Sequence, residues 1–108
     1  MNVRRRRVRV RDDVRRTYER ELESDCEALL RINGWLLYHT FDSRRSVAGF
    51  PDLIAIRGTR LLVLELKSET GKVTDAQREW LEAFARTGAE CYVVRPRNVD
   101  ELAAIVAR

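Results

Sequence analysis

The sequence is poor in cysteine, proline and histidine, and it has no long apolar run. Its two cysteines, Cys26 and Cys91, lie far apart and form no Cys-x-x-Cys pair, which excludes a disulfide framework and a cysteine-rich zinc site. No apolar stretch approaches the ~20 residues that a membrane-spanning helix needs, and no apolar signal region follows the N-terminal arginines. We therefore expect reduced cysteines and a cytoplasmic protein with no membrane partner.

Lysine is also scarce, because only Lys67 and Lys72 are lysines among the 21 basic residues. Arginine is concentrated at one end: residues 1–16 hold eight arginines against two aspartates, whereas the rest of the chain has more acidic than basic residues. We interpret residues 1–16 as a basic arm and residues 17–108 as one domain with a single modest core. Because arginines neutralise phosphates, the arm favours a nucleic acid as partner, with a solvated tail as the alternative.

Apolar spacing and turn residues predict seven elements in the order αβββαβα, which is an α/β fold. Helices are predicted where apolar residues recur every three or four positions, and strands where short apolar or aromatic runs lie between turn residues. Gly58 suits the first central position of a two-residue type II′ turn between the second and third strands. The predicted helices are residues 17–33, residues 74–87 and a last helix that Asn98 caps, and the predicted strands are residues 35–41, 52–56, 61–67 and 90–95.

The hairpin between the second and third strands brings charged residues together. If residues 58 and 59 form its turn, Asp52 faces Glu65, and Lys67 points to the same face as Glu65 because it lies two residues further on. Two carboxylates directly opposite each other repel, and a bound divalent cation converts that repulsion into ligation. Oxygen ligands without His or Cys suit Mg²⁺ or Mn²⁺, which we expect Asp52, Glu65 and the Leu66 carbonyl to bind. The alternative is that these charges lie in solvent at the strand ends.

These residues resemble the VRR-NUC branch of the PD-(D/E)xK nucleases. The resemblance covers about residues 17–108 and rests on Gly49-Phe-Pro-Asp-Leu53, on Glu65-Leu-Lys67 at hairpin distance, and on Gln77 in the next helix. It implies a restriction-endonuclease-like core, with a mixed four-stranded sheet flanked by helices, and Mg²⁺- or Mn²⁺-dependent hydrolysis of phosphodiester bonds in DNA. The stand-alone members that the chain resembles are phage-type nucleases that cut branched DNA such as four-way junctions, and some form homodimers. A duplex or branched DNA partner, a homodimer and a bacterial or phage-infected host cell are therefore expected.

The resemblance also implies an acidic residue from the first helix and supporting polar residues. Glu19 is the expected acid, as a metal ligand or a water-orienting residue, because it lies on the apolar stripe of the helix; Glu23, one turn later, is the alternative. Gln77 is expected to orient Lys67 or the phosphate, although Thr74-x-x-Gln77 is by itself a capping box. Further phosphate contacts are expected from Arg44, Arg45 and Ser46 in the loop before the Pro-Asp pair, and from Arg4, Arg5, Arg6 and Arg7 in the arm.

Other classes of function stay open at this point. One is a nucleic-acid-binding module of the same fold without catalysis, and another is an adaptor that pairs a strand over residues 8–11 with another protein. A nickase or flap nuclease of the same fold is a further alternative, because no motif that reads bases is visible. Divalent-metal-dependent cleavage of DNA separates the nuclease from the first two.

Overall fold

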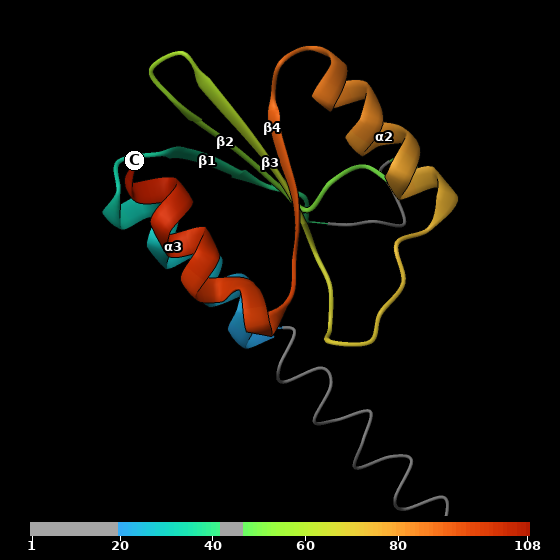
Figure 1. Ribbon diagram of the computed structural model, residues 1–108, viewed down its shortest axis with the longest axis horizontal. Coiled ribbons are helices and arrows are strands. Elements are labelled where there is room, and N and C mark those ends of the chain that lie inside the picture. The colour runs from blue at the N-terminus through green and yellow to red at the C-terminus, as the bar shows by residue number, and fades with distance from the viewer. Residues whose placement is uncertain (1–19, 42–46) are drawn as a thin grey trace, which may run out of the picture.

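In the computed structural model, which describes residues 20–41 and 47–108, four strands form one mixed sheet with helices on both faces (Figure 1). The strand order is β1-β2-β3-β4, with β1–β2 and β2–β3 antiparallel and β3–β4 parallel. The predicted order αβββαβα is confirmed, with bounds that differ by a few residues. The strands are β1 (Leu36–His39), β2 (Leu53–Arg57), β3 (Arg60–Leu66) and β4 (Glu90–Val94), and the helices are residues 20–32, α2 (Asp75–Arg86) and α3 (Val99–Ala107), the last preceded by a 3₁₀ turn (Pro96–Asn98).

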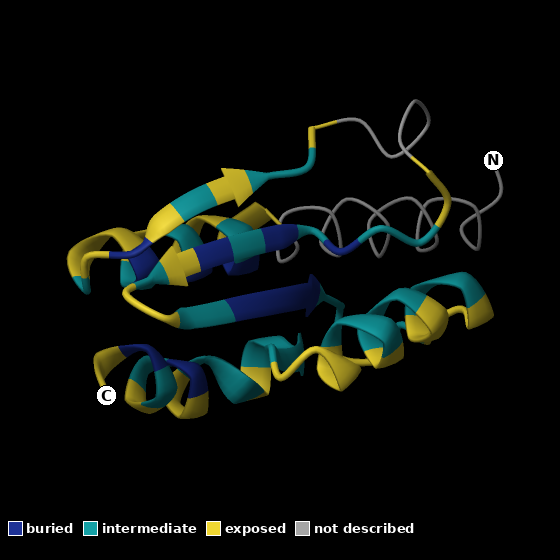
Figure 2. Cartoon of the chain, turned by 90° about the horizontal axis from the view of Figure 1, so that it is seen from above, coloured by how far each residue is buried: buried dark blue, intermediate teal, exposed yellow. Residues whose placement is uncertain are grey.

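The apolar core lies on one face of the sheet. Leu53 of β2 and Leu62 and Leu64 of β3 point to this face, because side chains alternate between the two faces of a strand. The helix over residues 20–32 and α3 cover them, whereas α2 lies on the opposite side of the sheet against β3 and β4 (Figure 1). These two helices contribute Leu22, Cys26, Leu30, Leu102 and Val106 to the core. Figure 2 shows the buried residues of β2 and β3 in dark blue. The alternation sends Glu65 to the face opposite Leu64.

The turn between β2 and β3 has the predicted two residues. Arg57 pairs with Arg60, and Gly58 has φ +61°, while no non-glycine residue of the described ranges has a positive φ. A type II′ turn needs positive φ only at its first central residue, so these values fit the prediction. The register continues outward to the pair of Leu53 and Leu64. One step further, this register sets Asp52 opposite Glu65, and the Asp52 carboxyl lies close enough to raise the pKa of Glu65.

The two later helices begin in different ways. In α2 the predicted capping box is present: the Gln77 N–H donates to Thr74 Oγ1 at 3.2 Å, and the Thr74 N–H donates to Gln77 Oε1 at 2.9 Å. Asn98 precedes α3 as expected, but its side chain makes no capping bond to that helix. Its Oδ1 instead accepts the Arg95 N–H at 3.0 Å, because the 3₁₀ turn folds the chain back at this point. The predicted cap of the last helix is therefore wrong in its hydrogen bonding.

The loop that carries the Pro-Asp pair packs directly on α2. Gly49 has φ +84°, and a Cβ atom added there would lie 2.4 Å from the carbonyl carbon of Ala76. Phe50 follows, with its ring centroid 5.1 Å from Trp80 and 6.0 Å from Phe84, both on α2. Both the backbone conformation and the close approach require glycine, so Gly49 sets where the chain enters β2.

We predict that Gly49→Ala destabilises the fold much more than Gly88→Ala does. Gly88 also has a positive φ, +92°, but an added Cβ would meet no atom within 4 Å. The shared conformational strain costs about 1–2 kcal/mol, and the clash with the first turn of α2 adds roughly 1–3 kcal/mol in the Gly49 variant. Urea unfolding midpoints of the two variants measure this difference. Equal losses would mean that the contact between the loop and α2 does not constrain the fold.

Candidate active site

Asp52 lies just before the first residue of β2, at a point where the neighbouring strand β3 continues. Its Oδ2 accepts the Leu66 N–H at 2.8 Å, so a side chain occupies the place that a neighbouring strand would otherwise fill. The N–H and C=O of one strand residue point to the same side of the strand, so the Leu66 carbonyl also faces Asp52. This hydrogen bond fixes the direction of the Asp52 carboxylate and brings it beside a backbone oxygen.

Glu65 is the buried carboxylate of the site. The residue is only 2% exposed, and its Oε2 has no hydrogen-bond partner among the described residues. Burial raises the pKa of Glu65 from its ordinary value of 4.5 to about 8. The negative charge of Asp52 and a proton shared with the Asp52 carboxyl also raise this pKa, and the positive charge of Lys67 lowers it in part. Without a cation, Glu65 is therefore stabilised as the neutral acid near neutral pH.

Lys67 lies beside this carboxylate without being bound by it. Its Nζ is 3.9 Å from Glu65 Oε1, which is close enough for electrostatic attraction and too long for a hydrogen bond. The side chain is 15% exposed, and the Lys67 N–H donates to the Val94 carbonyl at 2.9 Å, which fixes the backbone against β4. The ammonium donors of Lys67 therefore remain available to a substrate or a water.

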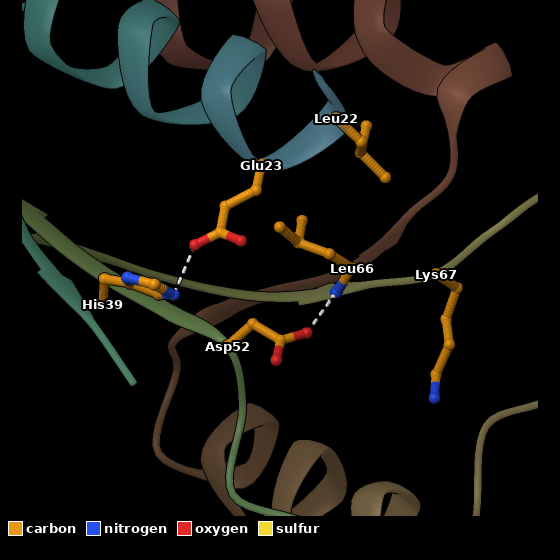
Figure 3. A pocket seen from close by; sticks show the side chains of 6 residues that line it. All are labelled: Leu22, Glu23, His39, Asp52, Leu66 and Lys67. Carbon is orange, nitrogen blue, oxygen red and sulfur yellow. Dashed lines mark hydrogen bonds and ion pairs between the residues drawn. The ribbon is translucent and has the colours of Figure 1, made fainter. Parts of the chain in front are cut away.

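A cavity of about 150 Å³ opens between the helix over residues 20–32 and the ends of β2 and β3 (Figure 3). Glu23 reaches from that helix toward the sheet and forms an ion pair with Nε2 of His39. Glu27 lies nearby, so that one ligand atom from each of Glu23, Glu27 and His39 lies within 4.8 Å of the others. The cavity is lined by Leu22, Glu23, His39, Asp52, Leu66 and Lys67.

The pair of Glu23 and His39 is the part of the site that sequence reasoning did not find. The two residues lie on different elements, and neither the helical period nor the strand period relates them. The presence of only one histidine in the sequence was the one available signal. The pair ties the helix to β1 at the edge of the cavity.

Several predicted site residues lie outside the described residues, and their assignments stay predictions. These are Glu19, Arg44, Arg45, Ser46, Arg4, Arg5, Arg6 and Arg7. Gln77 is described, and its backbone N–H and its Oε1 both serve the capping box of α2. Its structural role is thus present, while a role toward Lys67 or a phosphate stays a prediction.

The residues at the end of the hairpin fit a hard divalent cation. Two carboxyls face each other, one of them has a buried oxygen without a partner among the described residues, and the backbone carbonyl of Leu66 lies beside them. Mg²⁺ and Mn²⁺ prefer oxygen ligands of these types. Asp52, Glu65 and the Leu66 carbonyl would hold such an ion, which would take the place of the proton that Glu65 otherwise carries.

We predict that the metal-free protein loses stability as the pH rises from about 5 to 9. The folded-state pKa of Glu65 lies above its ordinary value of 4.5, so the folded state binds more protons than the unfolded state between pH 4.5 and about 8. The stabilisation is complete below pH 4.5 and is lost as the pH passes through about 8. The expected loss is on the order of 5 kcal/mol, measured by thermal or urea unfolding in a chelator.

Added Mg²⁺ or Mn²⁺ is expected to restore this stability, most strongly above pH 8 where Glu65 is ionised. Glu65→Gln should remove both the pH-dependent loss and the effect of the metal, because an amide neither ionises nor binds these ions well. Glu82→Gln, which changes an exposed carboxylate on α2, is the matched control and should keep both. A pH-dependent loss that survives unchanged in Glu65→Gln would contradict the assignment.

Solved structures support this reading of the fold. A structure described as a VRR_NUC domain is 24% identical, with a TM-score of 0.68 over 81% of this chain and 95% of that chain. Hjc of Archaeoglobus fulgidus, a Holliday junction resolvase from an archaeal hyperthermophile, is 30% identical, with a TM-score of 0.55 over 71% of this chain and 68% of that chain. A VRR_NUC domain protein is 20% identical, with a TM-score of 0.55 over 79% of this chain and 84% of that chain.

Among proteins of curated function, none matches the sequence significantly. In the described part of the chain, no helix has the length and apolar character required to cross a membrane. The model of the VRR-NUC domain matches residues 7–98, a range that includes the hairpin, the Glu-Leu-Lys segment and part of the basic arm. The chain therefore belongs to the VRR-NUC domain family, and its fold is that of the PD-(D/E)xK nucleases.

Proposed function

We propose that this protein is a divalent-metal-dependent DNA endonuclease that hydrolyses phosphodiester bonds in branched DNA such as four-way junctions. The observation that carries the proposal is the group formed by Asp52, the buried Glu65 and Lys67 at the end of the hairpin. The preference for branched DNA is supported by the similarity to the Holliday junction resolvase Hjc. We propose the cytoplasm of a bacterium or of a phage-infected host cell as its location.

The chemistry requires a water in line with the scissile bond and positive charge on the phosphate oxygens. A bound Mg²⁺ or Mn²⁺ would lower the pKa of a water and neutralise charge on the phosphate. Asp52 is fixed in direction by the Leu66 N–H, so its carboxylate needs little reordering to act as a ligand. Lys67, whose ammonium is not hydrogen-bonded to Glu65, orients the attacking water or contacts a phosphate oxygen.

The acid from the first helix is proposed to be Glu19. Glu23 is the alternative, and it lines the cavity next to Asp52. Its carboxylate already forms an ion pair with His39, which supports a structural role for Glu23 in holding the helix against β1. Glu19 remains the proposed acid because the sequence spacing places it on the apolar stripe of the first helix.

A second copy of the chain is proposed to cover the free part of the sheet. Leu36 and Tyr38 on β1 and Ile56 on β2 share one face and are 74%, 61% and 46% exposed. The helix α2 packs mainly on β4 and β3, so the described residues leave this apolar area largely exposed. Apolar patches of this kind are typical of interaction surfaces. A two-fold dimer suits a four-way junction, which needs two coordinated cuts.

We predict that Asp52→Asn, Glu65→Gln and Lys67→Ala each lower cleavage by at least about 100-fold, because each removes a ligand or charge that acts on the reacting phosphate. DNA binding should stay within about threefold, since binding rests mainly on phosphate contacts elsewhere. The measurement is cleavage of labelled duplex, flap, fork and four-way-junction DNA with Mg²⁺, with Mn²⁺ and with a chelator.

The same assay distinguishes Glu19 from Glu23 as the acid of the first helix, and it distinguishes the proposed function from its alternatives. Glu19→Gln should lose more activity than Glu23→Gln, and the reverse order would move the assignment to Glu23. Preferred cutting of the flap or of one duplex strand would favour the flap-nuclease or nickase alternative. Binding without cleavage under every metal condition would favour a non-catalytic module, and full activity in Lys67→Ala would overturn the active-site assignment.

We also predict that the protein in solution has about twice the mass of one 12.6 kDa chain. Leu36→Glu with Tyr38→Glu should convert it to a monomer, because two charges would have to be buried in the apolar contact. Ala85→Glu, an exposed change on α2, is the matched control and should leave the mass unchanged. Light scattering measures all three proteins. A wild-type monomer, with and without DNA, would count against junction resolution.

A further inference from the structure

A second hollow, larger and more open than the active-site cavity, lies where the chain passes from β3 into α2. Its volume is about 450 Å³, and four of its eight lining residues are basic, namely Lys72, Arg78, Arg95 and Arg97. Glu69 is the one carboxylate among the lining residues. We call this hollow the basic groove. Its positive charge favours an anionic ligand.

Two of the four basic residues build the groove. Arg95 donates through Nη1 to the carbonyl oxygens of Ser68 at 2.6 Å and of Gly71 at 2.7 Å, which fixes the turn after Lys67 against the end of β4. Arg97 forms an ion pair with Glu69 at 2.8 Å, and its N–H donates to the same carboxylate at 2.7 Å. These contacts neutralise the one acidic residue and hold the floor of the groove in place.

The other two basic residues are available to a ligand. Lys72 is exposed, and among the described residues it forms no ion pair. Arg78 is 58% exposed and lies 3.5 Å from an almost fully exposed Asp75, a contact that contributes little in water. Both charges therefore face solvent at the mouth of the groove.

The groove adjoins the active site through Gly71. Gly71 lines the groove, and a Cβ atom added to it would lie 3.6 Å from Cδ of Lys67. A strand of DNA with its scissile phosphate at Lys67 thus has its neighbouring phosphates close to Lys72. None of the lining residues is aromatic, so the groove offers charge to a phosphate backbone and no stacking surface to a base.

We propose that the basic groove binds backbone phosphates of the cleaved DNA strand next to the scissile phosphate, with Lys72 and Arg78 as the contacting residues. This inference rests on the proposed nuclease function and adds to it the path of the substrate. Such contacts position the strand without reading its sequence. They are separate from those expected of the arginine arm, because the groove is lined by the segment between β3 and α2, by α2 and by residues that follow β4.

The test compares two double variants that remove the same charge. Lys72→Ala/Arg78→Ala changes the groove, whereas Arg31→Ala/Arg86→Ala removes two exposed arginines at the C-terminal ends of the first helix and α2. Binding of a labelled four-way junction and a labelled duplex is titrated in a chelator over a range of salt concentrations. The groove variant should bind on the order of 10-fold more weakly near 0.1 M salt, with a salt slope shallower by about 1.8 for two lost contacts.

Cleavage by Arg31→Ala/Arg86→Ala at saturating DNA with Mg²⁺ or Mn²⁺ should equal that of the wild type, because neither arginine lines the groove or the active-site cavity. If the groove variant has the same DNA affinity and salt slope as Arg31→Ala/Arg86→Ala, the proposed DNA-binding role of the groove is contradicted. Cleavage by the wild type would in that case still support the nuclease function. Weaker DNA binding by the groove variant, together with no cleavage by the wild type, would support the groove as a DNA-binding site and contradict the nuclease function. If the double variant fails to fold, Lys72→Glu alone carries the same comparison against Arg86→Glu.

Discussion

The register of β2 against β3 is the constraint on which the rest of the site depends. Gly58 allows a two-residue turn, and the turn sets Arg57 opposite Arg60 and Leu53 opposite Leu64. A slip of one residue would exchange the two faces of a strand, which would bury Glu65 in the apolar core. In the actual register the apolar residues fill that core, and Asp52, just before the start of β2, accepts the Leu66 N–H.

The burial of Glu65 destabilises the fold. Its carboxyl lies beside a second carboxyl, with one oxygen that has no partner among the described residues, and burial holds its pKa near 8. An apolar residue at this position would stabilise the sheet more, because a buried charge without full hydrogen bonding is expensive. Groups of this kind are typical of functional sites, where a ligand compensates what the protein alone does not.

Features that depend on local periodicity could be predicted from the sequence. Contacts between elements that are distant in the chain could not. The hairpin register and the capping box of α2 follow from a few neighbouring residues, and both are confirmed. The ion pair of Glu23 and His39 depends on how a helix lies on a sheet, which no period encodes. Ile56 is 46% exposed although it lies on a central strand, because the helix α2 packs mainly on β4 and β3. Likewise, the basic groove joins three separate segments, and its residues show no pattern in the chain.

The positions of the two lysines connect the site to the groove. In a chain with 21 basic residues, the only lysines are Lys67 at the buried carboxyls and Lys72 in the groove five residues later. A guanidinium is planar and presents several donors in a fixed geometry, which suits permanent contacts. Arg95 and Arg97 make such contacts with the turn that follows Lys67. An ammonium is a compact, strongly hydrated charge with donors that rotate freely. Lysine therefore suits the two places that we propose hold a phosphate or a water and then release it, and arginine suits the contacts that fix the turn beside them.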